Sequence, residues 1–413
     1  MEPMDKLARC RAGQPGSPVI DRGVQMEGKE GIVDVKIRPL LSLFFLLPFL
    51  LAGCWDRVEI QDRLIVMAVA IDKVRTEDEK RNFYEFTAQL TEAQALSGRI
   101  STPNISPVWN ASATGPSIFE CIRILTTRVA RQPYYDHLQI IIIGEELAKE
   151  GIDRALDLFY RDHESRPKIK LVIAKGRARE VLDLDPKLMP ISGRYISTLM
   201  EEGEAKTARF PKTSTIGQFS SYFHGGANCV LPALRIEKRE AKMAGGAIMR
   251  GDRLVGWLSD QEVKTLRWLN GTFTAGDEVI VKNGPEQERN VTTFEVRGAR
   301  SSVKSEIRNG IPVFTFSIRG EGSLAEDGFD HKPSLRKLKE REKEISRNIK
   351  ENAEKLIVKM QKKKVDIFGL YEEMRRHQHP YWKQHRNNWD EVFQHADIHI
   401  DVVTYIRRFG QFK

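Results

Sequence analysis

The sequence predicts a multi-domain protein of mixed α/β and α+β fold, with two to three domains. The chain has 413 residues, which is more than one ordinary hydrophobic core accommodates. After Cys54, strand-like apolar runs alternate with amphipathic helix patterns, so we expect an α/β layer with a mixed sheet in the amino-terminal half. From Glu278 onward, several strand patterns precede the longest helix pattern. This order predicts a largely antiparallel sheet with a long helix in the carboxy-terminal half.

Residues 1–53 are predicted to be a signal peptide that is removed. Leu40–Leu51 is an uncharged apolar run with basic residues just before it. A helix needs about 20 apolar residues to cross a bilayer, so this run is too short to span one. A basic flank, a short apolar core and small residues at its end are typical of a secretory signal. The true start, Met1 or Met26, stays open.

The signal ends in a four-residue motif that resembles the bacterial lipobox, in which a cysteine receives a diacylglycerol before cleavage on its amino side. Leu51, Ala52 and Gly53 precede Cys54. The motif predicts an S-diacylglycerol and an N-acyl group on Cys54. Acyl chains contribute about 0.8 kcal/mol per buried CH₂, and stable anchoring takes more than one chain. The alternative is a buried cysteine beside a short core helix.

The first folded domain is expected over residues 54–200. Leu64–Ile71 is a continuous apolar run of strand length, typical of a strand covered on both faces. Phe83–Leu90 alternates and is rich in aromatic residues, which predicts the next strand. The other elements expected here are a loop over 96–115, a helix after Ser117, strands over 138–143 and 169–174, a helix over 145–162, and short helices over 180–184 and 195–202.

Residues 201–240 are interpreted as a connecting segment or part of a small middle domain, and residues 241–413 as a carboxy-terminal α+β domain. Met243–Met249 and Leu254–Leu258 flank a turn and predict a hairpin. Ser259 and Glu262 fit a capping box that begins a helix. The remaining expected elements are strands over 278–282, 291–296, 299–307 and 313–320, a helix over 335–363, an aromatic-rich helix around 382–393, and a strand over 398–406.

Charge and cysteine content limit the possible partners and the compartment. The chain has 66 Lys and Arg against 57 Asp and Glu, a formal net charge of +9. A basic protein is attracted to an anionic membrane surface. Nucleic acid is not an expected partner, because the mature chain is predicted to lie outside the cytoplasm. Four cysteines in this length exclude a disulfide scaffold. Cys121 and Cys229 are expected to be buried free thiols, although a disulfide between them stays open.

The catalytic and metal-binding patterns in the sequence predict no site, and we expect neither an enzyme nor a cofactor. Five of the nine histidines fall in residues 377–399. However, His395, Asp397, His399 and Asp401 alternate with apolar residues, which favours the solvent face of a strand over a metal site. Two S-x-x-K matches lack the companion motifs of a serine nucleophile. The chain has no phosphate loop and no G-x-G-x-x-G motif.

Aromatic residues are dense near the end of the chain, where arginine and histidine are also abundant. We expect most of them to anchor the last helix to the sheet. Aromatic and arginine residues also dominate protein–protein hot spots, so a partner surface is an alternative hypothesis. The residues proposed for this surface are Tyr381, Trp382 and Trp389.

Several stretches together resemble GerAC-type spore germination lipoproteins. The match includes the start of the predicted mature chain, a lysine-rich helix before a D-[IVF]-[FL]-G segment, a tryptophan pair and a closing strand. Leu370-Tyr371 departs from the family, which usually has a further small residue there. The matching residues are Cys54–Ile60 (CWDRVEI), Ile71-Asp72, Leu258–Leu269 (LSDQEVKTLRWL), Gln361–Gly369 (QKKKVDIFG), Trp382, Trp389 and Ile398–Ile406.

The resemblance implies the C subunit of a nutrient germinant receptor, without enzymatic activity and with three mixed α/β domains. It implies anchoring through acylated Cys54 on the outer surface of the spore inner membrane. The implied partners are a membrane A subunit with a large soluble domain and a permease-like B subunit. The alternatives are a solute-binding lipoprotein of a transporter, which needs two similar α/β lobes, and a cell-wall hydrolase.

Overall fold

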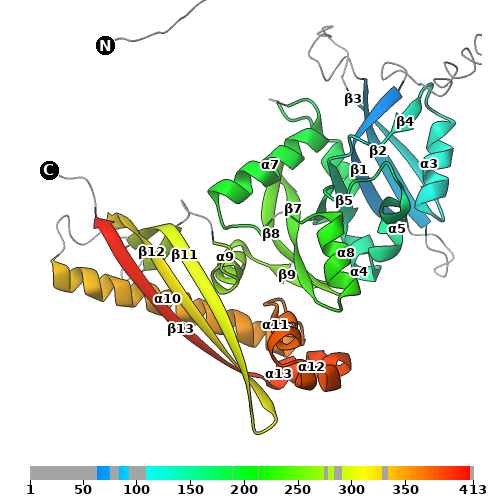
Figure 1. Ribbon diagram of the computed structural model, residues 1–413. Coiled ribbons are helices and arrows are strands. Elements are labelled where there is room, and N and C mark those ends of the chain that lie inside the picture. The colour runs from blue at the N-terminus through cyan, green and yellow to red at the C-terminus, as the bar shows by residue number, and fades with distance from the viewer. Residues whose placement is uncertain are drawn as a thin grey trace, which may run out of the picture. The chain divides into compact units, whose positions relative to one another are not determined.

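The computed structural model describes residues 63–74, 83–92, 108–187, 189–212, 214–273, 278–282, 291–327 and 334–409. The strands of this part of the chain form two sheets, each with its own helices (Figure 1). No helix within these residues is both long and apolar enough to cross a bilayer.

The first sheet is mixed, as predicted, with strand order β3-β2-β1-β5-β6-β7-β8-β9, and β4 also pairs with β1. The centre is parallel: β1 pairs with β5, β5 with β6, and β6 with β7. Both flanks are antiparallel. Its strands are β1 (Arg63–Val74), β2 (Phe83–Glu92), β3 (Val108–Gly115), β4 (Gln132–Tyr134), β5 (Ile140–Gly144), β6 (Lys170–Ala174), β7 (Cys229–Glu237), β8 (Glu240–Arg250) and β9 (Arg253–Leu258).

Helices cover both faces of this sheet, which explains why the central strands are apolar throughout. On β5, Ile141 and Ile143 belong to one core cluster, and Ile140 and Ile142 to another. The first cluster includes residues of α3 (Ile118–Thr126), α4 (Glu145–Glu150), α5 (Asp153–Arg161) and α8 (Ile216–His224). The second includes residues of α6 (Ala178–Leu182) and α7 (Ser192–Lys206).

Three differences from the expected elements have local causes. The helix predicted over 145–162 is two helices, because Gly151 between them has a φ of 130°. Residues 108–115 of the predicted loop form β3, which pairs with β2. Helix α8 lies in a stretch that has no clear apolar periodicity, and a capping box at Thr215 and Gln218 begins it.

The second sheet has strand order β10-β11-β12-β13. The first three strands are antiparallel, and β13 is parallel to β12, which the long connection through α10 and four shorter helical segments permits. The sheet is therefore largely antiparallel, as predicted. Two predicted strands are one, β11, with a register shift between Val296 and Gly298. The strands are β10 (Glu278–Lys282), β11 (Val291–Arg308), β12 (Ile311–Asp327) and β13 (Asp397–Phe409).

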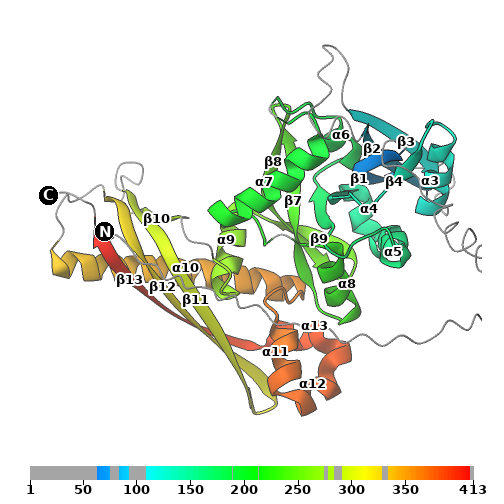
Figure 2. The same cartoon turned by 45° about the horizontal axis from the view of Figure 1, so that its top comes forward.

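Helices α9 (Asp260–Leu269) and α10 (Leu335–Lys363) supply apolar residues to the core of the second sheet. Helix α10 runs alongside the strands of this sheet (Figure 2). The capping box at Ser259 and Glu262 is confirmed at the start of α9. Helix α10 is also bonded to the last strand: the Ile406 amide donates to Glu342 Oε1 at 2.8 Å. The shorter helices are α11 (Leu370–His377), α12 (His379–His385) and α13 (Trp389–His395).

The first sheet extends past the expected domain limit of 240/241 and ends with β9 at Leu258, before α9 begins at Asp260; the limit itself stays a prediction. Strands β7 and β8 form a hairpin across that limit, and β9 extends the same sheet. Residues 201–240 likewise contribute α8 and β7 to the first layer. Cys121 and Cys229 are buried free thiols.

Candidate functional site

The predicted lipid-attachment site lies outside the described residues. Cys54 and the lipobox residues Leu51, Ala52 and Gly53 all precede residue 63, where the description begins. Acylation of Cys54 therefore stays a prediction.

Trp389 is not part of an exposed surface, which corrects the partner-surface hypothesis for this residue. Its side chain is 5% exposed, and its indole N–H donates to Asp366 Oδ2 at 3.1 Å. Asp366 also accepts hydrogen bonds from the amides of Phe368 (2.9 Å) and Tyr371 (2.7 Å). Burial raises the pKa of Asp366, and these hydrogen bonds oppose that rise. Trp389 and Asp366 thus hold the start of α11.

Tyr381 and Trp382 are half-buried, so the partner-surface hypothesis stays a prediction for them. The Tyr381 hydroxyl donates to the carbonyl of Gly310 at 3.1 Å, which attaches α12 to the turn between β11 and β12. The Trp382 ring packs against Tyr371 with centroids 5.7 Å apart. These contacts agree with the expected anchoring of the last helices to the sheet.

The polar residues of the last strand lie on its exposed face, as the period-two pattern predicted. Asp397, His399 and Asp401 are exposed, and Ile400 between them is buried. Within the described ranges, no group of three or more histidine, cysteine or acidic residues is arranged to hold a metal ion.

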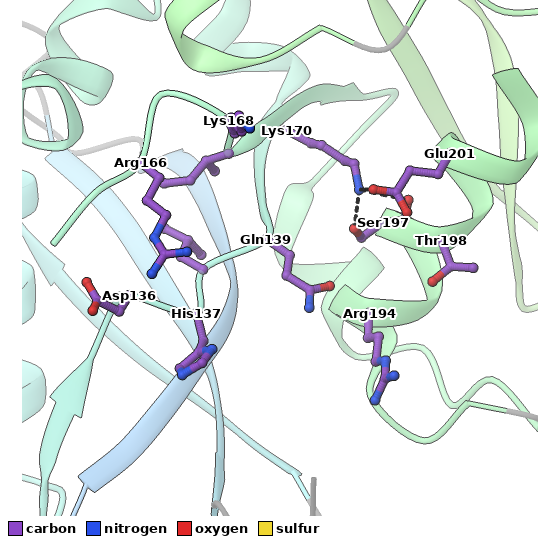
Figure 3. A pocket seen from close by; sticks show the side chains of 12 residues that line it. Asp136, His137, Gln139, Arg166, Lys168, Lys170, Arg194, Ser197, Thr198 and Glu201 are labelled. Atoms are coloured by element: carbon purple, nitrogen blue, oxygen red, sulfur yellow. Dashed lines mark hydrogen bonds and ion pairs between the residues drawn. The ribbon is translucent and has the colours of Figure 1, made fainter. Parts of the chain in front are cut away.

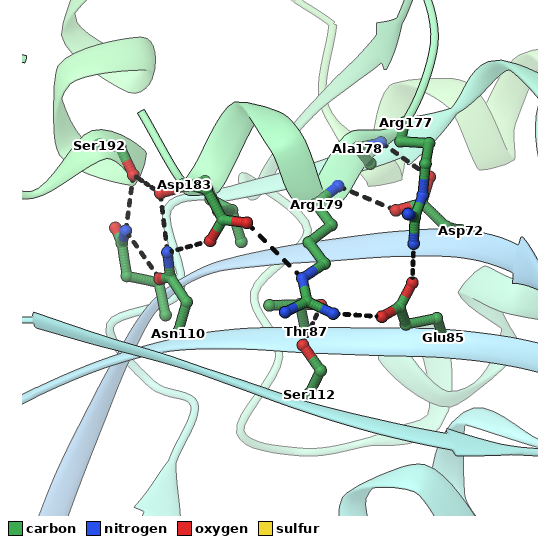
Figure 4. A network of polar contacts seen from close by, with 12 residues as sticks. Asp72, Glu85, Thr87, Asn110, Ser112, Arg177, Ala178, Arg179, Asp183 and Ser192 are labelled. Atoms are coloured by element: carbon green, nitrogen blue, oxygen red, sulfur yellow. Dashed lines mark hydrogen bonds and ion pairs between the residues drawn. The ribbon is translucent and has the colours of Figure 1, made fainter. Parts of the chain in front are cut away.

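A closed polar network occupies the carboxyl ends of the parallel strands in the first sheet (Figure 4). Asp72, near the end of β1, accepts hydrogen bonds from the backbone amides of Ala178 (2.7 Å) and Arg179 (2.8 Å) at the start of α6. Glu85 on β2 pairs with Arg177 and, at 2.6 Å, with Arg179. We call these five residues the carboxyl-end network.

The carboxyl-end network is tightly packed around Asp72. Open α/β sheets usually bind ligands beyond the carboxyl ends of their strands. Here Asp72 is 4% exposed, and a Cβ atom added at Gly144 would lie 2.1 Å from Asp72 Oδ1. Burial raises the pKa of Asp72, while the hydrogen bonds from Ala178 and Arg179 lower it. The usual ligand position therefore holds one of the chain's own carboxylates.

An open polar cleft lies at the opposite end, beside the amino ends of β5 and β6. Its volume is about 470 Å³. Figure 3 shows one wall with Arg166, His137 and Gln139 and another, on α7, with Arg194 and Glu201. We call this the amino-end cleft. Its lining residues are Asp136, His137, Leu138, Gln139, Arg166, Lys168, Ile169, Lys170, Arg194, Ser197, Thr198 and Glu201.

Lys170 joins the two walls of the amino-end cleft. It is the first residue of β6 and is 9% exposed. Its ammonium group donates to Ser197 Oγ at 2.6 Å and to the Ser197 carbonyl at 3.2 Å, and it forms an ion pair with Glu201. Lys170 therefore fixes α7 against the sheet and is itself fully paired.

The other cations of the cleft have no such partners. Arg166, Lys168 and Arg194 are exposed, and no carboxylate of the described chain lies within 4.0 Å of their charged groups. These three residues were not among the predicted site residues. A signal was present, since Arg166, Lys168 and Lys170 alternate with Pro167 and Ile169 at the start of a strand. No sequence pattern places Arg194 beside them.

Comparison with known proteins gives consistent matches along nearly the whole chain. Residues 56–236 match the family described as "Spore germination protein N-terminal domain", and residues 244–410 match "Spore germination B3/GerAC like, C-terminal". Spore germination protein B3 of Bacillus subtilis is 30% identical over 91% of this chain and 99% of its own length. Spore germination protein KC of the same organism is 25% identical over 90% of this chain and 96% of its own length.

A solved structure has the same fold. The crystal structure of the GerBC protein is 26% identical and superposes with a TM-score of 0.55. The superposition covers 83% of this chain and 98% of the GerBC chain. The likeness therefore extends over both sheets rather than over one common motif.

Proposed function

The chain belongs to the GerAC family of spore germination proteins, and on this basis we propose that it is the lipid-anchored C subunit of a nutrient germinant receptor. The observation that carries the proposal is the full-length match to spore germination protein B3, which covers 91% of this chain and 99% of that protein. A match of this extent includes both family domains and the segment that joins them.

The proposed role is assembly and signalling without enzymatic activity. None of the relatives reported above has the name of an enzyme. The folded part of the chain with its two sheets would dock on the membrane A and B subunits of the receptor. We propose that these partners perform most of the nutrient sensing.

Acylated Cys54 would hold this body on the outer surface of the spore inner membrane. Two observations support the anchor. Cys54 follows a short apolar run that ends in small residues. The match to the amino-terminal family domain begins at residue 56, directly after the proposed new amino end. Acyl chains buried in the bilayer would supply the attachment.

The test replaces the proposed acylated residue in spores. With Cys54→Ser, we expect the protein to leave the membrane fraction or to stay uncleaved, and germination triggered by nutrients to slow at least tenfold. Cys10→Ser, in the predicted signal segment, is the matched control and should change neither. Normal germination by spores whose Cys54→Ser protein is wholly soluble would refute the anchoring role.

The comparisons do not support the two alternative functions. A solute-binding lipoprotein of a transporter needs two similar α/β lobes, whereas the second sheet is largely antiparallel with one parallel edge strand. The reported relatives are germination proteins, not transport proteins or cell-wall hydrolases.

A further inference from the structure

The amino-end cleft combines positive charge with a concave shape. Arg166 and Lys168 approach it from the segment before β6, and Arg194 approaches it from α7. Positive side chains that surround one hollow add up to a raised electrostatic potential inside it. Since these three have no carboxylate partner in the described chain, that potential is not cancelled by direct ion pairs.

The lining has four lysine and arginine side chains against two carboxylates, and neither carboxylate pairs directly with Arg166, Lys168 or Arg194. Glu201 pairs with the buried ammonium group of Lys170. Asp136 accepts a hydrogen bond from the hydroxyl of Tyr134. Both acidic groups are thus engaged by neighbouring donors rather than by Arg166, Lys168 or Arg194.

Uncharged donors complete the lining. The side chains of Gln139 and Thr198 are half-buried and make no hydrogen bond with the described part of the protein. A half-buried amide with no protein partner leaves its two N–H groups for water or for a ligand. Gln139 lies on the wall with Arg166 and His137, across from Arg194 on α7 (Figure 3).

The size and the rigidity of the cleft favour a small ligand. A volume of about 470 Å³ falls in the range of about 300–1,000 Å³ that is usual for small-molecule sites. Lys170 holds its two walls together through Ser197 and Glu201, so the hollow is formed before anything binds. Arginine side chains bind carboxylate and phosphate groups through two parallel N–H donors.

We propose that the amino-end cleft binds a small anion that carries carboxylate or phosphate groups, held by Arg166, Lys168 and Arg194 with Gln139 as an uncharged donor. The site is independent of the proposed role in germination, because its occupancy is a property of the purified chain.

Isothermal titration calorimetry on the full-length chain in detergent, at low ionic strength, tests the site. The probes are succinate and inorganic phosphate, and the neutral analogue succinamide is the control ligand. We expect one-to-one binding of at least one anion and none of succinamide. Binding of succinate but not of phosphate identifies a dicarboxylate site. Binding of phosphate but not of succinate identifies a phosphate site. Absence of binding by both anions at millimolar concentration would overturn the proposal.

A double substitution separates the cleft from general surface charge. Arg166→Gln with Arg194→Gln should raise the Kd at least tenfold without shifting the thermal unfolding midpoint, because both side chains are exposed. Arg253→Gln with Arg376→Gln removes the same charge from exposed positions elsewhere and should change the Kd by less than twofold. If the two double variants weakened anion binding equally, the attraction would be non-specific and the proposed site would be refuted.

Discussion

The two ends of the parallel strands in the first sheet use polar residues in opposite ways. At the carboxyl ends, Asp72 and Glu85 are buried, and each is bonded to donors from the segment that begins α6. At the amino ends, Arg166 and Arg194 are exposed around a hollow and have no acidic partner in the described chain. The first arrangement satisfies its own charges and stabilises the fold. In the second arrangement, the arginine side chains stay available to bind another molecule.

This difference reverses the usual location of ligands in α/β sheets. The start of a helix attracts an anion, and here an internal carboxylate fills that position at α6. We therefore expect substitutions at the carboxyl ends to change stability and substitutions at the amino ends to change binding. Three experiments sharpen or break this division.

The largest effect is expected from Asp72→Ala. The substitution leaves the buried amides of Ala178 and Arg179 without an acceptor, and it should lower the free energy of unfolding by about 3 kcal/mol. Urea denaturation measures the loss. Arg194→Ala in the amino-end cleft is the control and should stay within about 0.5 kcal/mol of the wild type. Equal losses in the two variants would contradict the division between stability and binding.

Gly144→Ala is expected to have an intermediate effect. The backbone at Gly144 has a φ of −69°, which alanine adopts freely, so any loss comes from crowding. Its new methyl group would lie 2.1 Å from Asp72 Oδ1 and would displace that carboxylate. We expect a loss of about 1–3 kcal/mol in the same denaturation assay. Thr198→Ala removes a group of similar size from the open cleft and should hardly change the free energy of unfolding. If Gly144→Ala were as stable as the wild type, the carboxyl ends would have room for a methyl group.

The smallest effect is expected in the pH dependence of the free energy of unfolding. Burial raises the pKa of Asp72 in the folded protein, so the folded state binds more protons than the unfolded state between the two pKa values. The contribution of Asp72 to stability is then fully present below the unfolded pKa and is lost as pH rises through the folded pKa. The stability difference between wild type and Asp72→Asn should therefore be larger at pH 4.5 than at pH 7.

Urea denaturation at both pH values measures this difference. The difference between wild type and Thr198→Ala, which removes no ionisable group, should not depend on pH. A difference between wild type and Asp72→Asn that grows toward neutral pH would show that the hydrogen bonds from Ala178 and Arg179 outweigh burial.

The sequence predicted the features that depend on neighbouring residues. The run Leu64–Ile71 predicted a strand covered on both faces, and Ser259 with Glu262 predicted the start of α9, because a strand pattern and a capping box are local. Gly151 ended a predicted helix early, although its left-handed backbone was not evident from composition alone.

Features that depend on distant contacts could not be predicted in this way. Trp389 was proposed for an exposed surface, but its partner Asp366 lies 23 residues earlier and buries it. The amino-end cleft joins residues near 137, 167 and 197, which meet only because β5 and β6 are neighbours and α7 packs across them. The order of strands in a sheet is a property of the whole chain, so no local pattern shows it.

The parallel pairing of β12 with β13 has a consequence for synthesis of the protein. Strand β13 follows β12 and α10 in the sequence, so both are synthesised before the strand that pairs with β12 and donates to Glu342 of α10. A ribosome that stops early would release a product in which β12 keeps an open edge and α10 an uncovered apolar stripe. Such a product is prone to aggregation and degradation, so the fold favours polypeptides that include β13.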